Sequence, residues 1–185
     1  MVKEWCKRIS EQIGNNKEEK EIIEYGLNQF FWILINFFSI IIGGYIWKEF
    51  RFSVLVFLGV YFMRPYVGGY HADTEIRCYI FSVGIVNVAI MMRKFIQLSW
   101  GVMLGVYIYF IAVIILFSPL DNPIHLLNKE DREYYRNISG KLVLLYSFLL
   151  VVSEILKIKI LKDAIIYTVI IVGTSVLVGK WKYKK

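Results

Sequence analysis

The chain has 185 residues, of which 57% are hydrophobic and 17% aromatic, and it carries a formal net charge of +7. A soluble domain of this length is nearer half apolar and holds more charge than the 20% found here, so the composition indicates a membrane-embedded chain. The basic residues are scattered between apolar runs, which suits anionic lipid headgroups and argues against nucleic acid as a partner. Two cysteines are too few for a disulfide framework.

The first residues are predicted to form an amphipathic helix that lies in the membrane interface. Val2, Trp5, Ile9 and Ile13 recur at spacings of three and four, while charged residues occupy the other positions. The segment is too polar to cross a bilayer. After it, the pattern Asn-x-x-Glu at residues 16–19 is expected to cap the next helix.

Six apolar runs follow, at residues 27–47, 51–63, 79–92, 98–117, 142–156 and 160–179. A spanning helix needs about 20 apolar residues, and the shorter runs reach that length only with their flanking residues. We therefore expect an all-α polytopic membrane protein with about six transmembrane helices. Four spans remain the alternative if the 51–63 and 79–92 runs are re-entrant.

The chain is predicted to be a single membrane-embedded domain, residues 1–185. It divides into an amphipathic N-terminal region (1–26), a transmembrane core (27–179) and a basic C-terminal tail (180–185). With six spans and a cytoplasmic N-terminus, 15 of the 22 basic residues fall on the cytoplasmic side. The positive-inside rule therefore places both termini in the cytoplasm of a multi-pass cell-membrane protein.

The polar stretch RPYVGGYHADTEIRC, residues 64–78, joins the second and third runs on that cytoplasmic side. It contains His71 and Cys78, which would lie about 10 Å apart on one straight helix because they are seven residues apart. A Cys–His catalytic pair needs nearly direct contact. Gly68 and Gly69 permit a sharp turn before His71, and Asp73 or Thr74 is suited to cap a new helix.

Cys78 would then lie in the first turn or two of a membrane helix, where the positive end of the helix dipole stabilises a thiolate. His71 would be its general base and acid. These two residues alone leave a structural role open, because an interfacial His and a Cys at a span end are commonly structural. The two His and two Cys lack metal-ligand spacing, so no metal is expected.

The pattern GG-x-H-A-x5-C in this stretch resembles the signature of the accessory gene regulator B (AgrB) family. The likeness extends over the whole chain. It includes the amphipathic N-terminus, the segment EIIEYGLNQ that enters the first span, the loop PLDNPIHLLNKEDREYYR and the basic tail KWKYKK.

The resemblance implies a membrane cysteine endopeptidase that matures a quorum-sensing peptide. In this family the Cys attacks a small AgrD-like precursor near its acidic C-terminal tail and forms a thioester acyl-enzyme. A Cys or Ser of the precursor then closes a thiolactone or lactone ring. Carried over, Cys78 is the nucleophile and His71 its base and acid. The resemblance implies no cofactor, and it implies a homodimer, on which the residues carry no information.

Supporting roles are expected for five neighbouring residues. Gly68 and Gly69 set the turn, and Ser82 lies one helical turn beyond Cys78 on the same face, where it lines the site or packs against another helix. Arg64 and Arg77 attract either the acidic tail of the precursor or lipid phosphates.

Backbone N–H groups of residues 76–78 are expected to form an oxyanion hole at the start of the helix that carries Cys78.

Two other functions remain open from the sequence. A non-enzymatic membrane protein, such as a small transporter subunit, would pair charged residues inside its spans. The span centres are nearly free of charge except for Glu154 and the basic cluster at 157–162, which counts mildly against transport. A thiol-dependent acyltransferase would carry a lipid thioester on Cys78 instead of a peptide.

Overall fold

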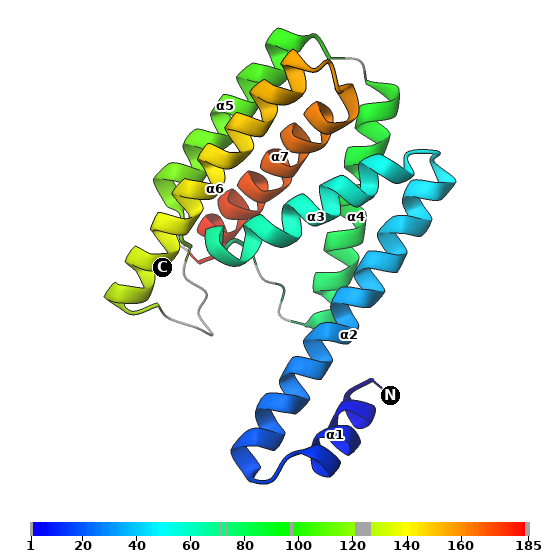
Figure 1. Ribbon diagram of the computed structural model, residues 1–185, viewed down its shortest axis with the longest axis vertical. Coiled ribbons are helices and arrows are strands. Elements are labelled where there is room, and N and C mark those ends of the chain that lie inside the picture. Colours follow the sequence, from blue (N-terminus) through cyan, green and yellow to red (C-terminus); the bar gives the residue numbers. More distant parts are fainter. Residues whose placement is uncertain (1, 71, 73, 97, 121–126, 184–185) are drawn as a thin grey trace. The chain divides into compact units, whose positions relative to one another are not determined.

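The computed structural model describes residues 2–70, 72, 74–96, 98–120 and 127–183. These residues form seven helices and no strand (Figure 1): α1 Val2–Ile13, α2 Lys17–Ile46, α3 Phe50–Val67, α4 Glu75–Phe95, α5 Trp100–Phe117, α6 Lys129–Ile155 and α7 Lys159–Lys182. The prediction of an all-α fold is confirmed.

Six of these helices, α2 to α7, are long and apolar enough to cross a membrane. The short apolar runs at 51–63 and 79–92 lie in α3 and α4, which are complete helices of 18 and 21 residues. Flanking polar residues therefore complete these two helices to spanning length, which favours six spans over four. The six apolar helices indicate a multi-pass membrane protein.

Outward-facing side chains support this assignment. On α6 the exposed fraction is 71% for Leu144 and 64% for Phe148, far more apolar exposure than a helix in water would tolerate. These positions face lipid in a membrane, where apolar surface carries no penalty.

The described residues form two compact units, residues 1–39 and 40–185, and each is described by itself. In the first unit two residues of the apolar stripe predicted for α1 are exposed: the exposed fraction is 64% for Trp5 and 63% for Ile13. Such an exposed apolar stripe is typical of a helix that lies in the membrane interface. The predicted cap of α2 is present: Asn16 Oδ1 accepts the Glu19 N–H at 2.8 Å, and Glu19 Oε2 accepts the Asn15 N–H at 2.9 Å.

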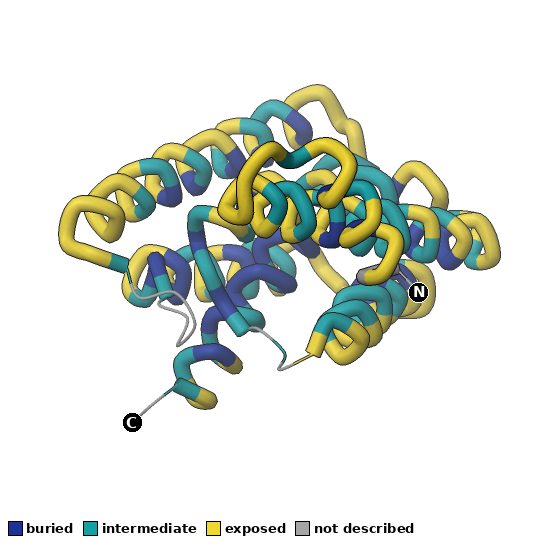
Figure 2. Tube along the Cα trace, turned by 90° about the horizontal axis from the view of Figure 1, so that it is seen from below, coloured by how far each residue is buried: buried dark blue, intermediate teal, exposed yellow. Residues whose placement is uncertain are grey.

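The second unit is built around α7. This helix contacts α3, α4, α5 and α6, and 61% of its most apolar stretch is buried, against 17–28% for the other spans. Dark blue runs along the helix that leads to the C-terminus in Figure 2. Neighbours approach α7 closely at small residues: a Cβ on Gly59 would lie 2.5 Å from Thr168 Oγ1, and one on Gly173 would lie 2.5 Å from Phe110 Cδ1.

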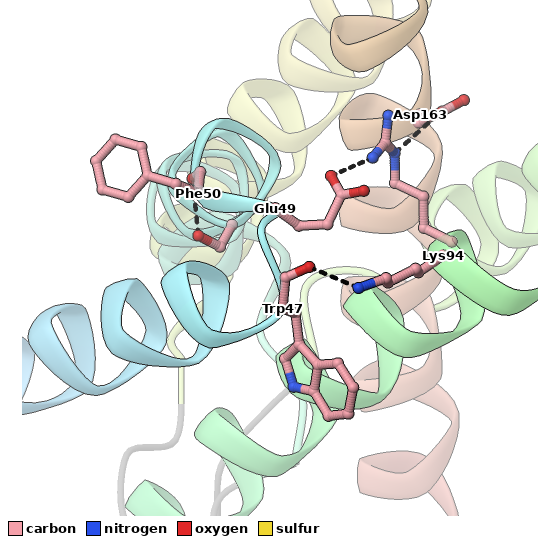
Figure 3. A network of polar contacts seen from close by, with 7 residues as sticks. Trp47, Glu49, Phe50, Lys94 and Asp163 are labelled. Atoms are coloured by element: carbon pink, nitrogen blue, oxygen red, sulfur yellow. Dashed lines mark hydrogen bonds and ion pairs between the residues drawn. The ribbon is translucent and has the colours of Figure 1, made fainter.

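At one end of this unit, three charged residues connect three elements. Arg93, near the end of α4, donates from Nε to Asp163 Oδ2 of α7 at 2.9 Å and from Nη1 to Glu49, which precedes α3 (Figure 3). Its guanidinium also lies 4.8 Å from the centroid of the Phe52 ring. Asp163 is only 4% exposed, so its charge is tolerated because Arg93 neutralises it. We call Glu49, Arg93 and Asp163 the ion triad.

The opposite end of the unit gathers the C-terminal ends of α3, α5 and α7. Gly68, directly after α3, pairs with Leu120, which follows α5. Tyr70 bonds to Ser175 of α7. Consecutive helices from α3 to α7 therefore alternate in direction, and the site described below lies at the end away from the ion triad.

The ion triad yields a prediction of stability. Asp163→Ala leaves Arg93 with one fewer partner in a buried setting and is expected to lower the free energy of unfolding by about 3 kcal/mol. Glu154→Gln is the matched control. Glu154 pairs with Lys162 at 2.8 Å but its side chain is 45% exposed, so its loss should cost less than about 1 kcal/mol. Denaturant titration in detergent micelles measures both. Equal effects of the two substitutions would contradict the structural role of the triad.

Candidate active site

The turn between α3 and α4 begins at the two glycines. The Gly68 N–H donates to the Arg64 carbonyl at 3.0 Å and closes α3. Gly68 then has φ +75° and Gly69 φ +140°, both in the region that residues with a Cβ rarely adopt. The predicted sharp turn is therefore present at the expected residues.

A third segment holds this turn. The Leu120 N–H donates to the Val67 carbonyl at 3.2 Å, and a Cβ on Gly68 would lie 2.7 Å from the Leu120 carbonyl oxygen. The two backbones can approach this closely only because residue 68 lacks a side chain. This contact could not be predicted, because 52 positions separate Gly68 from Leu120 and Leu120 looks like an ordinary loop residue.

Tyr70 connects the turn to three helices. Its N–H donates to the carbonyl oxygen of Ser175 at 2.8 Å and to Ser175 Oγ at 3.1 Å. Its own carbonyl accepts from Nη2 of Arg64 on α3. Its ring packs edge-on against Phe81 of α4, 5.7 Å between centroids, and Lys182 Nζ lies 4.9 Å from its centroid.

Thr74 caps α4, as one of the two expected candidates. Its side-chain Oγ1 accepts from the Arg77 N–H at 3.3 Å, and its carbonyl accepts from the Cys78 N–H at 3.0 Å. Cys78 is thus the fourth residue of α4, within the first turns of a membrane helix as predicted. It is a free cysteine and half-buried.

This cap occupies N–H groups that were expected to form the oxyanion hole, so that prediction is corrected in part. The N–H groups of Arg77 and Cys78 are both taken by Thr74, because a capping residue satisfies the amides that the helix leaves without an internal acceptor. Two of the three expected donors are therefore engaged within α4 and its cap.

The other predicted site residues differ in exposure, and one of them is not described. Ser82 is half-buried one turn beyond Cys78 on α4, and Arg77 is exposed near the start of the same helix. Arg64 is half-buried on α3, and its Nε is buried without a hydrogen-bond partner in the described part of the chain. His71 follows Tyr70 in the chain and lies outside the described residues, as does Asp73.

Two further observations on the described residues bear on where the site lies. Among the described residues, no three His, Cys, Asp or Glu side chains cluster as metal ligands would. A hollow of about 670 Å³ is an open groove beside the α2–α3 turn and Ile160, at the end away from Cys78. The chemistry-bearing residues around the Gly-Gly turn therefore identify the candidate site.

Comparison with known proteins decides the family. The family model described as Accessory gene regulator B matches residues 3–179 of the chain. The chain belongs to the accessory gene regulator B family. The match covers α2 to α6 and nearly all of α7, so the resemblance seen in the motif around His71 and Cys78 is confirmed for the whole spanning region. Membership in this family supports a role accessory to quorum sensing.

Three relatives from Clostridium perfringens are similar to this AgrB family member. "Putative AgrB-like protein 1" of strain 13 / Type A is 28% identical over 110 residues, 60% of this chain and 54% of the relative. "Putative AgrB-like protein 2" of the same strain is 26% identical over 163 residues, 82% of this chain and 74% of the relative. An AgrB-like protein of strain SM101 / Type A is 26% identical over 172 residues. The chain spans about half the length of the first relative, and no solved structure matches it.

The cap of α4 yields a prediction for this AgrB family member. Thr74→Val removes the side-chain acceptor and is expected to cost about 1 kcal/mol at the helix start, equivalent to about fivefold faster amide exchange. Thr74→Ser keeps the acceptor and should leave exchange unchanged. Hydrogen exchange of residues 75–80 in lipid nanodiscs measures both. Equal protection in the two variants would show that the cap does not hold the start of the Cys78 helix.

Proposed function

We propose that this protein is a membrane cysteine endopeptidase that removes the C-terminal tail of an AgrD-like quorum-sensing precursor and closes the remaining peptide into a thiolactone or lactone ring. One observation carries the proposal. The family motif GG-x-H-A-x5-C coincides with a glycine turn and with the capped start of a membrane helix, and it puts Cys78 in the first turns of that helix.

The break in the backbone supports pairing of His71 with Cys78. α3 ends at Val67 and α4 begins at Glu75, so no single helix runs through both motif positions. The separation of about 10 Å that a straight helix would impose therefore does not apply. Contact between His71 and the Cys78 thiol would complete the base–nucleophile pair that acyl transfer needs.

The reaction has two acyl-transfer steps. His71 takes the thiol proton, and the Cys78 thiolate attacks the scissile carbonyl of the precursor. The C–N bond breaks, His71 protonates the departing amine of the tail, and a thioester to Cys78 remains. A Cys thiol or Ser hydroxyl within the precursor then attacks this thioester, closes the ring and returns the proton and the free thiol to the enzyme.

Cyclisation in place of hydrolysis requires that water stays away from the thioester. The surroundings of Cys78 are suited to this requirement. Phe81, one helical turn beyond Cys78 on α4, is 59% exposed in the isolated chain and would face lipid. The half-buried thiol then lies next to the bilayer rather than in bulk water.

Substrate capture and orientation form part of the proposal. Arg77, exposed at the start of α4, is suited to attract an acidic peptide tail or a lipid phosphate. The bias of basic residues favours cytoplasmic termini, which puts the end that carries Cys78 on the cytoplasmic side. Membrane lipids and a second copy of the chain are the other proposed partners.

One observation bears on the transporter alternative. The ion triad is a buried charged cluster near span ends, the feature that a transporter subunit would show. Its three charges bind one another, however, so they hold α3, α4 and α7 together rather than present a free charge to a solute. An acyltransferase would differ by carrying a lipid acyl group on Cys78.

A processing assay tests the proposal. The protein in liposomes is mixed with a candidate precursor, and mass spectrometry follows the peptide. The wild type should release the tail and leave a fragment lighter by one water than the hydrolysed product, while Cys78→Ala and His71→Ala should abolish processing. Cys6→Ala is the matched control and should process normally.

Other outcomes of this assay would contradict the proposal. A linear fragment that retains the water would make the protein a hydrolase and overturn the cyclisation step. Processing that survives Cys78→Ala would overturn the nucleophile.

A further inference from the structure

The last turns of α7 form a seat for the loop that precedes His71. Ser175 accepts the Tyr70 N–H through both its carbonyl oxygen and its hydroxyl. One turn later, a Cβ on Gly179 would lie 2.8 Å from the Tyr70 nitrogen and 2.9 Å from the Gly69 carbonyl carbon. The loop backbone therefore lies directly on the α7 surface. We call Ser175 and Gly179 the α7 seat.

The Tyr70 backbone is held from both sides. α7 accepts its N–H, and Arg64 of α3 donates to its carbonyl. The ring adds a third anchor, since it packs on Phe81 of the helix that carries Cys78. Fixing the N–H and carbonyl of Tyr70 restricts where the next residue, His71, can begin.

α7 is suited to position a catalytic group because it is the most enclosed helix of the unit. Gly179 itself is buried, and the closest atoms to its missing side chain include backbone atoms of the loop, which cannot rotate away as a flexible side chain would. A site held by packed elements keeps its geometry more closely than one held by loops alone.

We propose that Ser175 and Gly179 are positioning residues of the catalytic loop, and that Arg64 acts with them by holding the Tyr70 carbonyl rather than by binding substrate. The proposal rests on the proposed function, because the group being positioned is His71 opposite Cys78. It assigns a role in the reaction to α7, a helix that carries none of the residues of the GG-x-H-A-x5-C motif.

A pair of Gly→Ala variants tests the α7 seat. Gly179→Ala puts a methyl group against the loop backbone, whereas Gly140→Ala on α6 puts one where no atom lies within 4 Å. Both replace a helical glycine by a better helix former, so neither should unfold its helix. Gly179→Ala is expected to lower kcat of precursor processing about 10- to 100-fold, with KM nearly unchanged, because a small displacement of a catalytic group has that effect.

Ser175→Ala is the second variant and is informative even if Gly179→Ala fails to fold. It removes the hydroxyl acceptor and keeps the carbonyl acceptor, so kcat should fall less, about three- to tenfold. For Arg64→Ala, a positioning role lowers kcat, whereas a substrate-binding role raises KM.

Amide exchange of residues 68–78 in nanodiscs gives a readout that needs no substrate. Faster exchange at Tyr70 in both seat variants, together with the kcat loss and normal behaviour of Gly140→Ala, supports the proposal. Wild-type kcat in Gly179→Ala, a rise in KM alone, or an equal kcat loss in Gly140→Ala would overturn it. If the wild type processes no precursor, the proposed function fails, and unchanged exchange at Tyr70 would then overturn the seat as well.

Discussion

The contact between α7 and the backbone of residues 68–70 is the constraint on which the site depends. Non-helical backbone near the bilayer persists only where the protein satisfies its polar groups. Four backbone groups of this segment have partners, and these come from three parts of the chain. Arg64 accepts the Gly68 N–H and donates to the Tyr70 carbonyl, Leu120 donates to the Val67 carbonyl, and Ser175 accepts from Tyr70. These bonds let the chain leave α3, turn and start α4 at a new point.

Contacts at both ends of the unit position α7. Asp163 near its start binds Arg93 at the end of α4, while Ser175 and Gly179 near its finish receive the loop that leads into α4. About 18 Å of helix separates Asp163 from Ser175. The ion triad thus fixes the axial position of α7 against α4, and the seat uses that position to hold the loop before Cys78.

Features set by neighbouring residues could be predicted from the sequence. The six spans follow from hydropathy, the turn from Gly68-Gly69 and the helix start from Thr74. Two of the three expected oxyanion donors are already engaged, because the same threonine that starts the helix also accepts the N–H groups of Arg77 and Cys78. Ser175, Gly179 and Leu120 could not be found this way, since nothing local distinguishes a glycine that touches a distant loop from one that faces lipid, such as Gly140. Arg93 and Asp163 likewise look like ordinary residues at span ends until the fold brings them within 2.9 Å.

The central claim is that Cys78 carries the peptide during the reaction, and trapping that intermediate tests it most directly. The protein is mixed with a precursor whose internal Cys or Ser is replaced by Ala, so that the ring cannot close, and the mixture is quenched in acid. Mass spectrometry should find the truncated peptide attached to Cys78, and neutral hydroxylamine should remove it as it removes a thioester. Release of the tail with no adduct on Cys78, or an adduct on Cys6 or Ser82 instead, would contradict the account.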